Sequence, residues 1–331
     1  MRYSLLITAS GLLTGVSSHG VVTSIQGANG VEMPGLSIAD GTPRDCSSNR
    51  CGSQADTAII RDREIASGEV GPLGRTQGNG PINAETMIRT FMSGATAPTN
   101  DGAADSVGVE DNIDQGQLQG GQGGQDAQDA QGGQDAQDGE DGQGRQGGLR
   151  GIFGRQFGGF LSGLFGGGGG QETEKPKEDI VAASAGQGAT AGLPTCADDG
   201  AITMTFRQIN QDGAGPMEAA IDPTSGGTDP DAFQTAEVTQ DVPGLGIQGL
   251  SLATNTDFPL TVQMPAGMTC EGTVGGANNV CIVRVRNGAA AGPFGGSAAF
   301  TQSPTARKRA IEYRLKKRSM ERSMDSRRRR R

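Results

Sequence analysis

A repetitive segment rich in Gly, Gln and Asp lies near the middle of the chain and limits how much of it can fold. The stretch "GGQDAQDAQ" from Gly123 is followed directly by "GGQDAQDGE" from Gly132. Such a segment lacks apolar periodicity, so it cannot offset the entropic cost of ordering, about 1 to 2 kcal/mol per residue. We therefore predict a long disordered insertion over residues 101–192.

The remaining sequence contains two globular pieces, residues 19–100 and 193–303. The chain has 57 glycines, no tryptophan and 34% hydrophobic residues, which is too little apolar surface to pack all 331 residues around one core. Together the two pieces have roughly the length of one ordinary domain. We predict a single domain that the insertion interrupts.

Apolar residues in these pieces recur with a period of two. Apolar and polar residues alternate in "AITMTFRQI" from Ala201, in "FPLTVQM" from Phe258 and in "NVCIVRVRN" from Asn279. This period indicates half-buried strands, whereas helical spacing is clear only in "NAETMIRTFM" from Asn83. We predict an all-β fold, an antiparallel β-sandwich of the immunoglobulin-like or monooxygenase-like kind.

Residues 1–18 have the parts of a signal peptide. A basic start at Arg2 precedes the apolar run "YSLLITASGLLTGV" and small residues before His19. The run is too short to span a bilayer, and no other stretch reaches the ~20 apolar residues that a membrane helix needs. We predict cleavage before His19, a secreted extracellular protein and no transmembrane segment.

Residues 145–166, inside the insertion, combine phenylalanines at helical spacing with three arginines. This pattern is typical of a segment that lies on a membrane or on a partner. Its glycines oppose a stable helix, since each costs roughly 1 kcal/mol relative to Ala. Membrane contact through this segment and a merely sticky linker both remain open.

Residues 304–331 form a basic tail. From Arg307 onward, 13 Lys and Arg stand against three acidic residues, a net charge of +10 in a chain of net charge −9. Basic tails commonly bind nucleic acid, but a signal peptide contradicts that role, so we expect no nucleic-acid partner. We predict a disordered tail. Dibasic cleavage after Arg309 and Arg318 would remove it. Otherwise it would hold the acidic insertion or anionic cell-wall polymers electrostatically.

Five cysteines are consistent with disulfides and secretion, with one thiol left unpaired or shared between molecules. Cys270 and Cys281 flank a turn-rich loop between two strand-like runs, so we predict that they pair. Cys46, Cys51 and Cys196 compete for a second bridge, and the sequence leaves that pairing open.

Four sequence blocks together resemble a known family. They are "GTPRDCSSNRC", "QADTAIIRDREI", "GPLGRTQGNGPINAE" and "NVCIVRVRNGAAAGPFGG". In this order they are similar to the blocks of the Egh-like fungal virulence factors, secreted proteins associated with appressoria. The resemblance implies a role in penetrating or remodelling a host surface. It also implies that relatives often have cysteines where this chain has Leu73, Val285 and Ser297.

Candidate catalytic groups are few. The single histidine, His19, would lie at the mature N-terminus, and no Gly-x-Ser-x-Gly motif is present. Carboxylates could form a glycosidase-like pair, but spacing selects no two of them, and ordinary ion pairs are far more common. The carboxylates considered are Asp45, Asp62, Glu64, Glu85, Asp198 and Asp199.

We therefore favour a noncatalytic protein that binds cell-wall polysaccharide or another host-surface polymer and needs no cofactor. The alternative is a copper-dependent enzyme like the lytic polysaccharide monooxygenases, with the amine and imidazole of mature His19 as ligands. The chain lacks the second imidazole, so Asp45 or Asp62 would have to complete that site. We expect His19 to bind Cu(II) but to support no efficient oxidative cleavage.

Overall fold

The computed structural model describes residues 19–44, 46, 52–100, 170–172, 178–211, 213–246, 249–289 and 292–329. The predicted signal peptide, Asp45, Cys51 and the segment 145–166 lie outside these residues. Signal-peptide cleavage and membrane contact therefore stay predictions.

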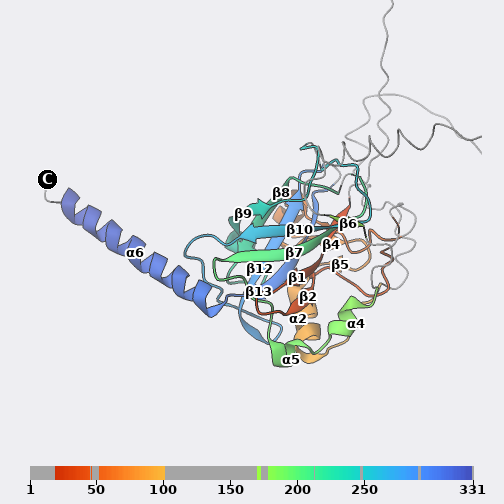
Figure 1. The fold of residues 1–331 in the computed structure, drawn as a ribbon, viewed down its shortest axis with the longest axis horizontal. Coiled ribbons are helices and arrows are strands. Elements are labelled where there is room, and N and C mark those ends of the chain that lie inside the picture. Colours follow the sequence, from red (N-terminus) through yellow and green to blue (C-terminus); the bar gives the residue numbers. More distant parts are fainter. Residues whose placement is uncertain are drawn as a thin grey trace, which may run out of the picture. The chain divides into compact units, whose positions relative to one another are not determined.

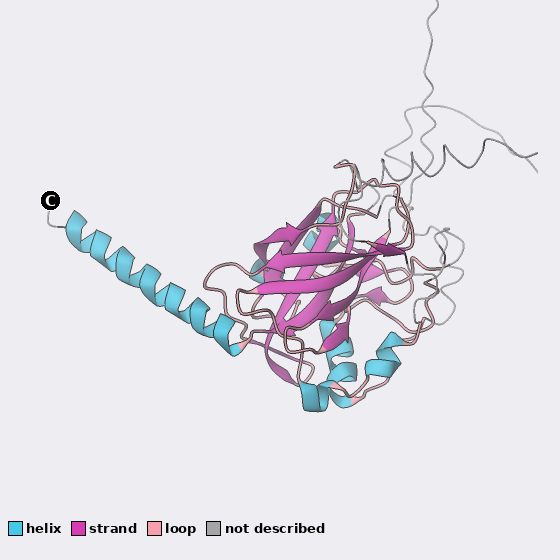
Figure 2. Cartoon of the chain, in the orientation of Figure 1, coloured by secondary structure: helices cyan, strands magenta, loops and turns pink. Residues whose placement is uncertain are grey.

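Antiparallel strands dominate the described structure (Figures 1 and 2). They form one 13-stranded sheet in the order β2-β1-β7-β10-β9-β8-β12-β13-β3-β4-β5, with β6 beside β10 and β11 beside β12. Among the described residues every pairing of these strands is antiparallel, which confirms the predicted all-β fold. The strands are β1 (Gly20–Gln26), β2 (Glu32–Pro34), β3 (Ala58–Ile59), β4 (Arg75–Thr76), β5 (Gly80–Pro81), β6 (Gln171–Glu172), β7 (Ala201–Gln208), β8 (Met217–Asp222), β9 (Gln234–Gln240), β10 (Thr256–Gln263), β11 (Gly272–Val274), β12 (Ala277–Asn287) and β13 (Phe294–Thr301).

The sheet curls into a half-barrel, which brings β1 and β13 together although they are not neighbours in the strand order. The N–H of Leu36 donates to the carbonyl oxygen of Ser297 at 2.9 Å. A Cβ on Gly296 would lie only 2.8 Å from the backbone nitrogen of Val22, so glycine permits this close approach. The two facing layers of the predicted sandwich are therefore parts of one continuous sheet.

The period-two pattern correctly identified the core faces of the adjacent strands β7 and β10. The buried pairs that lie directly opposite each other are Phe206–Phe258, Met204–Leu260 and Ile202–Val262. Complete burial of each such side chain contributes about 1.5 to 3 kcal/mol. In β12, by contrast, Cys281, Ile282 and Val283 are buried in succession, because β12 lies between β8 and β13 and contacts a helix as well.

The short helices lie at the margins of the sheet. They are α1 (Asp62–Ala66), α2 (Ala84–Ser93), α4 (Ile180–Ser184), α5 (Gly188–Ala191) and the 3-10 turn η3 (Pro230–Ala232). Helix α2 confirms the predicted helix: the Asn83 side chain accepts from the Glu85 N–H, and Gly94, with φ of 70°, ends it. Within the described part of the chain, no helix is long and apolar enough to cross a membrane.

The predicted disorder of the insertion is wrong for residues 170–172 and 178–192. Strand β6 pairs with β10, and α4 and α5 pack against α2. Val181 is buried, and its N–H and that of the next residue donate to the Asp40 carboxylate at 2.9 and 2.8 Å. Contacts with residues distant in sequence order this Gly- and Ala-rich segment, and local composition cannot reveal them.

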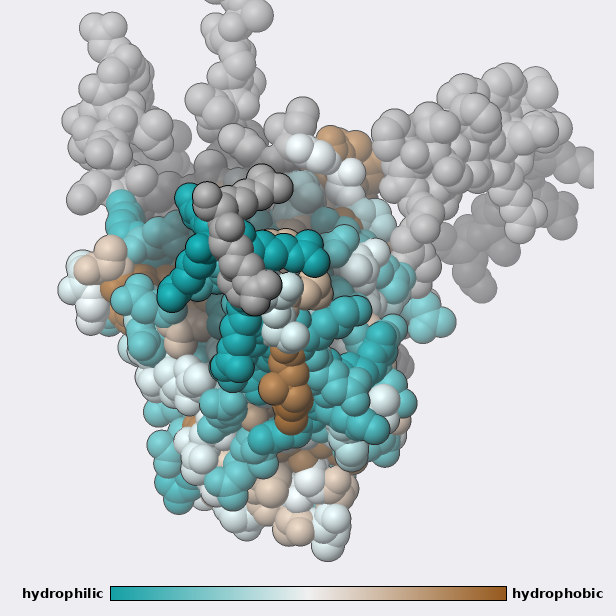
Figure 3. Space-filling view, turned by 90° about the vertical axis from the view of Figure 1, so that its left-hand side faces the viewer, coloured by the Kyte–Doolittle hydropathy of each residue, from teal (hydrophilic) through white to brown (hydrophobic). Residues whose placement is uncertain are grey.

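The predicted disorder of the basic tail is also wrong, since Pro304–Arg328 forms helix α6. The Ser303 hydroxyl accepts from the Ala306 N–H at 3.1 Å, and Pro304 occupies the first turn. Most of the following residues are strong helix formers, and Ala306 and Ala310 are buried at the base. Beyond this base α6 projects from the sheet, with hydrophilic side chains around it (Figures 1 and 3). Charge repulsion alone is therefore too weak to unfold it.

Candidate functional site

His19 lies just before β1 and is buried, with 1% of its surface exposed. Its backbone N–H donates to Asn210 Oδ1 at 2.7 Å, and Asn210 Nδ2 lies 3.4 Å from its Nδ1. Its ring packs against Phe294 of β13, with 4.7 Å between the ring centroids. His19 is thus part of the packing at the start of β1.

The described residues do not fit the copper site of the alternative hypothesis. They contain no group of three His, Cys, Asp or Glu side chains placed to hold a metal ion. Asp62 is ion-paired with Arg286, and Asp45 lies outside the described residues. One polar neighbour of His19 is the carboxamide of Asn210, whereas imidazole is the ligand that copper favours.

Three of the carboxylates considered as catalytic groups form ion pairs instead. The pairs are Asp62–Arg286, Glu64–Arg61, Glu64–Arg75 and Glu85–Arg89. The hydrogen bond from Arg286 holds the pKa of Asp62 below its ordinary value. All three carboxylates therefore have an arginine partner, as the ordinary ion-pair interpretation expects.

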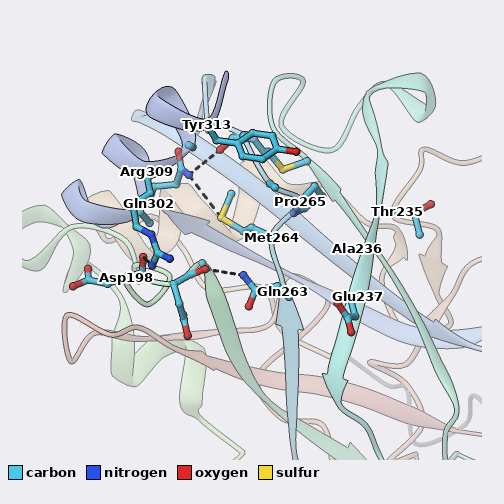
Figure 4. Close-up of a pocket in the computed structure, with 17 residues that line it drawn as sticks. Asp198, Thr235, Ala236, Glu237, Gln263, Met264, Pro265, Gln302, Arg309 and Tyr313 are labelled. Carbon is cyan, nitrogen blue, oxygen red and sulfur yellow. Dashed lines mark hydrogen bonds between the residues drawn. The ribbon is translucent and has the colours of Figure 1, made fainter. Parts of the chain in front are cut away.

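Asp198 and Asp199 instead line a cavity of about 540 Å³ at the base of α6, which we call the basal pocket (Figure 4). Five parts of the chain contribute to it: the loop before β7, strand β9, the end of β10 with the following loop, Gln302 after β13, and the first turns of α6. Three carboxylates, those of Asp198, Asp199 and Glu237, face one guanidinium, that of Arg309. The lining therefore has an excess of negative charge.

Hydrogen bonds fix one wall of the basal pocket. Arg309 Nη1 donates to the carbonyl oxygen of Asp198 at 3.0 Å, and the Ser303 hydroxyl donates to Asp198 Oδ1 at 2.8 Å. Gln263 Nε2 donates to the carbonyl oxygen of Asp199 at 2.7 Å. These bonds join α6 and β10 to the loop before β7.

A disulfide and a carboxamide fix the loop at the pocket floor. Cys270 and Cys281 are bonded, with 5.0 Å between their Cα atoms, which ties this loop to β12. Gln302 Oε1 accepts from the Cys270 N–H, and Gln302 Nε2 donates to the carbonyl oxygen of Met268, both at 3.0 Å. The loop is therefore held from two sides.

Tyr313 gives the basal pocket its aromatic surface and is 47% exposed. Its ring lies close over Gly267, where φ is +84° and an added Cβ would lie 2.9 Å from the ring. Thr235 and Glu237 on β9 lie across the pocket from it (Figure 4). An exposed ring facing hydroxyl, carboxylate and carboxamide groups suits a ligand with apolar faces and many hydroxyls, such as a sugar.

Sequence reasoning missed this site because Tyr313 fell in the predicted disordered tail and the other lining residues belong to no motif. One local signal was present. Ser303 followed by Pro304 is a helix start, and Ala306, Ala310 and Tyr313 follow at helical spacing on one face. That pattern predicts a helix docked through this face.

The described cysteines outside the Cys270–Cys281 disulfide, Cys46 and Cys196, are not among the residues that line the basal pocket. Cys46 is disulfide-bonded, and Cys51 lies outside the described residues. Cys196 is a buried free thiol, and burial raises its pKa. A raised thiol pKa disfavours the reactive thiolate, so Cys196 is packed as a small apolar side chain.

Comparisons with known proteins agree with the sequence blocks. The family model described as Egh16-like virulence factor matches residues 17–295. The chain is 50% identical over 326 residues to the appressoria-specific virulence factor GAS2 of Pyricularia oryzae, covering 98% of this chain and 97% of that relative. It is 37% identical over 155 residues to the appressoria-specific virulence factor GAS1 of the same organism, covering 46% of this chain and 58% of that relative. No solved structure matches.

The resemblance inferred from the four sequence blocks is thereby confirmed. The relatives are appressoria-specific virulence factors, which supports a virulence role. A family match across most of the chain, together with 50% identity along nearly all of its length, shows that this chain belongs to the Egh16-like virulence factor family.

Proposed function

We propose that this chain is a secreted, noncatalytic protein of the host interface that binds a cell-wall or host-surface polysaccharide in the basal pocket. The virulence role of its relatives supports a location at the host interface. The observation that carries the binding proposal is the half-exposed Tyr313 ring opposite the polar groups of β9.

The pocket chemistry favours a hydroxyl-rich ligand. The side chains of Glu237 and Thr235 are exposed and form no hydrogen bond or ion pair with another described residue, so the Glu237 carboxylate is available to accept hydrogen bonds and the Thr235 hydroxyl to accept or donate them. The apolar face of a sugar ring would lie on Tyr313, as flat apolar surfaces do on aromatic rings. The negative charge of the lining favours a neutral or cationic polymer over an anionic one.

The same lining limits the chemistry that the basal pocket could perform. The described residues that line it include no His, Cys, Lys or Ser, so its carboxylates are the main acid-base groups, and Asp198 Oδ1 already accepts a hydrogen bond from the Ser303 hydroxyl. The single histidine of the chain is buried against Asn210 and Phe294 instead.

The test is retention of the purified protein on insoluble chitin, β-glucan and cuticle. Tyr313→Ala should weaken retention about tenfold, because loss of an aromatic contact costs roughly 0.5 to 1.5 kcal/mol beyond the buried area. Tyr313→Phe keeps the ring and should bind like the wild type. Leu315→Ala, an exposed position on the same helix outside the pocket lining, is the matched control.

Two results would overturn the proposal. One is the absence of retention of wild-type protein on all three polymers. The other is equal retention of Tyr313→Ala and the wild type, which would show that the polymer does not bind in the basal pocket.

A further inference from the structure

The outer part of α6, residues 314–329, is strongly basic and exposed. We call it distal α6. It has eight Lys and Arg against Glu321 and Asp325. Only Arg329 has an ion pair, with Asp325 at 3.1 Å, so the other seven cations have no ion-pair partner among the described residues. Distal α6 thus holds uncompensated positive charge.

Only the base of α6 has a clear role in packing. Arg307 Nη1 donates to Asn279 Oδ1 at 2.8 Å, and Arg309 Nη1 to the carbonyl oxygen of Asp198 at 3.0 Å. Beyond Arg314, whose side chain lies near Gly267, none of the described Lys and Arg side chains of the helix donates a hydrogen bond to the sheet. Packing with the sheet therefore does not account for this charge.

Arginines recur every four residues along one side of distal α6. Arg314, Arg318 and Arg322 are spaced so that their guanidinium groups follow one another about 6 Å apart along the helix axis. Like charges at this spacing repel and destabilise a helix by about 0.2 to 0.5 kcal/mol per pair. A row of anionic groups would remove the repulsion, and carboxylates match the forked geometry of guanidinium.

The apolar residues of distal α6 exclude the usual membrane-binding geometry. Leu315 and Met324 are exposed and nine residues apart, so at ~100° per residue they lie on opposite sides of the helix. A helix that lies in a membrane surface needs its apolar residues on one face. Hydrophilic side chains project from several sides of α6 (Figure 3). Such a helix stays in water and can contact a linear polyanion there.

We propose that distal α6 is a second binding site, which takes a linear anionic polysaccharide carrying carboxylate groups, a polyuronate. The charge of the rest of the chain, −19 against +10 for the basic tail, confines such a ligand to α6. This site is independent of the basal pocket, whose lining is negative and favours other polymers.

The test is isothermal titration calorimetry of the full chain with polygalacturonate at about 0.05 M salt, repeated at higher salt. Binding should weaken steeply as salt rises, and neutral dextran should give no signal. Arg318→Glu combined with Arg322→Glu should lower affinity at least about tenfold. Glutamate is also a good helix former, so this variant should keep its helix.

The matched control reverses two exposed arginines of the sheet domain, Arg63→Glu and Arg89→Glu, which changes the net charge by the same amount. It should bind polygalacturonate within about threefold of the wild type. Equal losses in the two double variants would overturn the proposal, because net charge alone would then explain binding. Absence of wild-type binding, or binding only to phosphatidylserine vesicles, would overturn it as well.

The two proposals fail separately. Tyr313→Ala should leave polygalacturonate binding unchanged, and the Arg318→Glu, Arg322→Glu variant should still be retained on the polymer that binds the basal pocket.

Discussion

The hydroxyl groups of Ser297 and Ser303 differ in their hydrogen bonding. Ser297 Oγ is buried without a hydrogen-bond partner among the described residues. Ser303 Oγ accepts from the Ala306 N–H and donates to Asp198 Oδ1. An unsatisfied buried hydroxyl costs about 1 to 3 kcal/mol, whereas an N-cap contributes about 1 kcal/mol.

Ser297→Ala should therefore raise the free energy of unfolding by about 1 kcal/mol, and Ser303→Ala should lower it by about as much. Thermal unfolding is the measurement, with expected shifts of roughly 2 to 4 °C in opposite directions. Shifts of the same sign would contradict the prediction that the Ser297 hydroxyl destabilises the fold and the Ser303 hydroxyl stabilises it.

Asp222 links stability to pH. Its carboxylate is fully buried and accepts from the N–H groups of Thr224, Ser225 and Gly227 and from the Ser225 hydroxyl. Burial is the largest single influence and opposes ionisation, but the hydrogen bonds together outweigh it and hold the pKa below its ordinary value of 3.8. The ionised group thus stabilises the fold above the unfolded-state pKa, and this stability is lost as pH falls through the folded-state pKa.

Asp222→Asn should be less stable than the wild type near neutral pH, and the difference should shrink between about pH 5 and pH 2. Urea unfolding of both proteins across this range measures it. A difference that stays constant with pH would mean that the Asp222 carboxylate does not titrate at a lowered pKa.

At the scale of elements, α6 has a docked base and an unsupported outer part. Proteases cut helices through local unfolding, which costs least where tertiary contacts are absent. Residues 307–310 are held by buried Ala310 and by the bonds of Arg307 and Arg309, whereas the dibasic sequence ending at Arg318 lies beyond them. The second predicted processing site is therefore more accessible to a protease than the first, and cleavage there would divide distal α6 between Arg318 and Arg322.

Brief treatment with dilute trypsin should cut first between residues 314 and 329 at the C-terminal end and spare Arg307 to Arg309. Mass spectrometry of the fragments identifies the new C-termini. Early cleavage after Arg309 would instead show that the base of α6 is undocked in solution. It would also leave the predicted loss of residues 310–331 as the favoured processing event.

At the scale of the whole chain, the two globular pieces share one sheet. From the first piece, β1 pairs with β7 and β3 pairs with β13. Limited proteolysis between about residues 101 and 169 should therefore leave the two fragments associated in gel filtration without denaturant. They should separate only in urea, because the core and both pairings must break. Separation under native conditions would contradict a single domain.

The family, the all-β character, helix α2 and the core faces of β7 and β10 could be predicted from the amino-acid sequence. These follow from local periodicity, because alternation along a strand decides which side chains can be buried together. The pairing of Cys270 with Cys281 was likewise predicted from the two strand-like runs that flank their loop.

The burial of His19, the ordered helices α4 and α5, and the basal pocket could not be predicted from the sequence, because they depend on contacts between distant segments. Asn210 and Phe294 meet His19, and Asp40 caps α4, across long separations in sequence. The basal pocket needs five separate segments, and Tyr313 becomes part of it only because buried Ala306 and Ala310 dock α6 against the sheet. Such contacts depend on how distant segments pack, and no local pattern of residues specifies that packing.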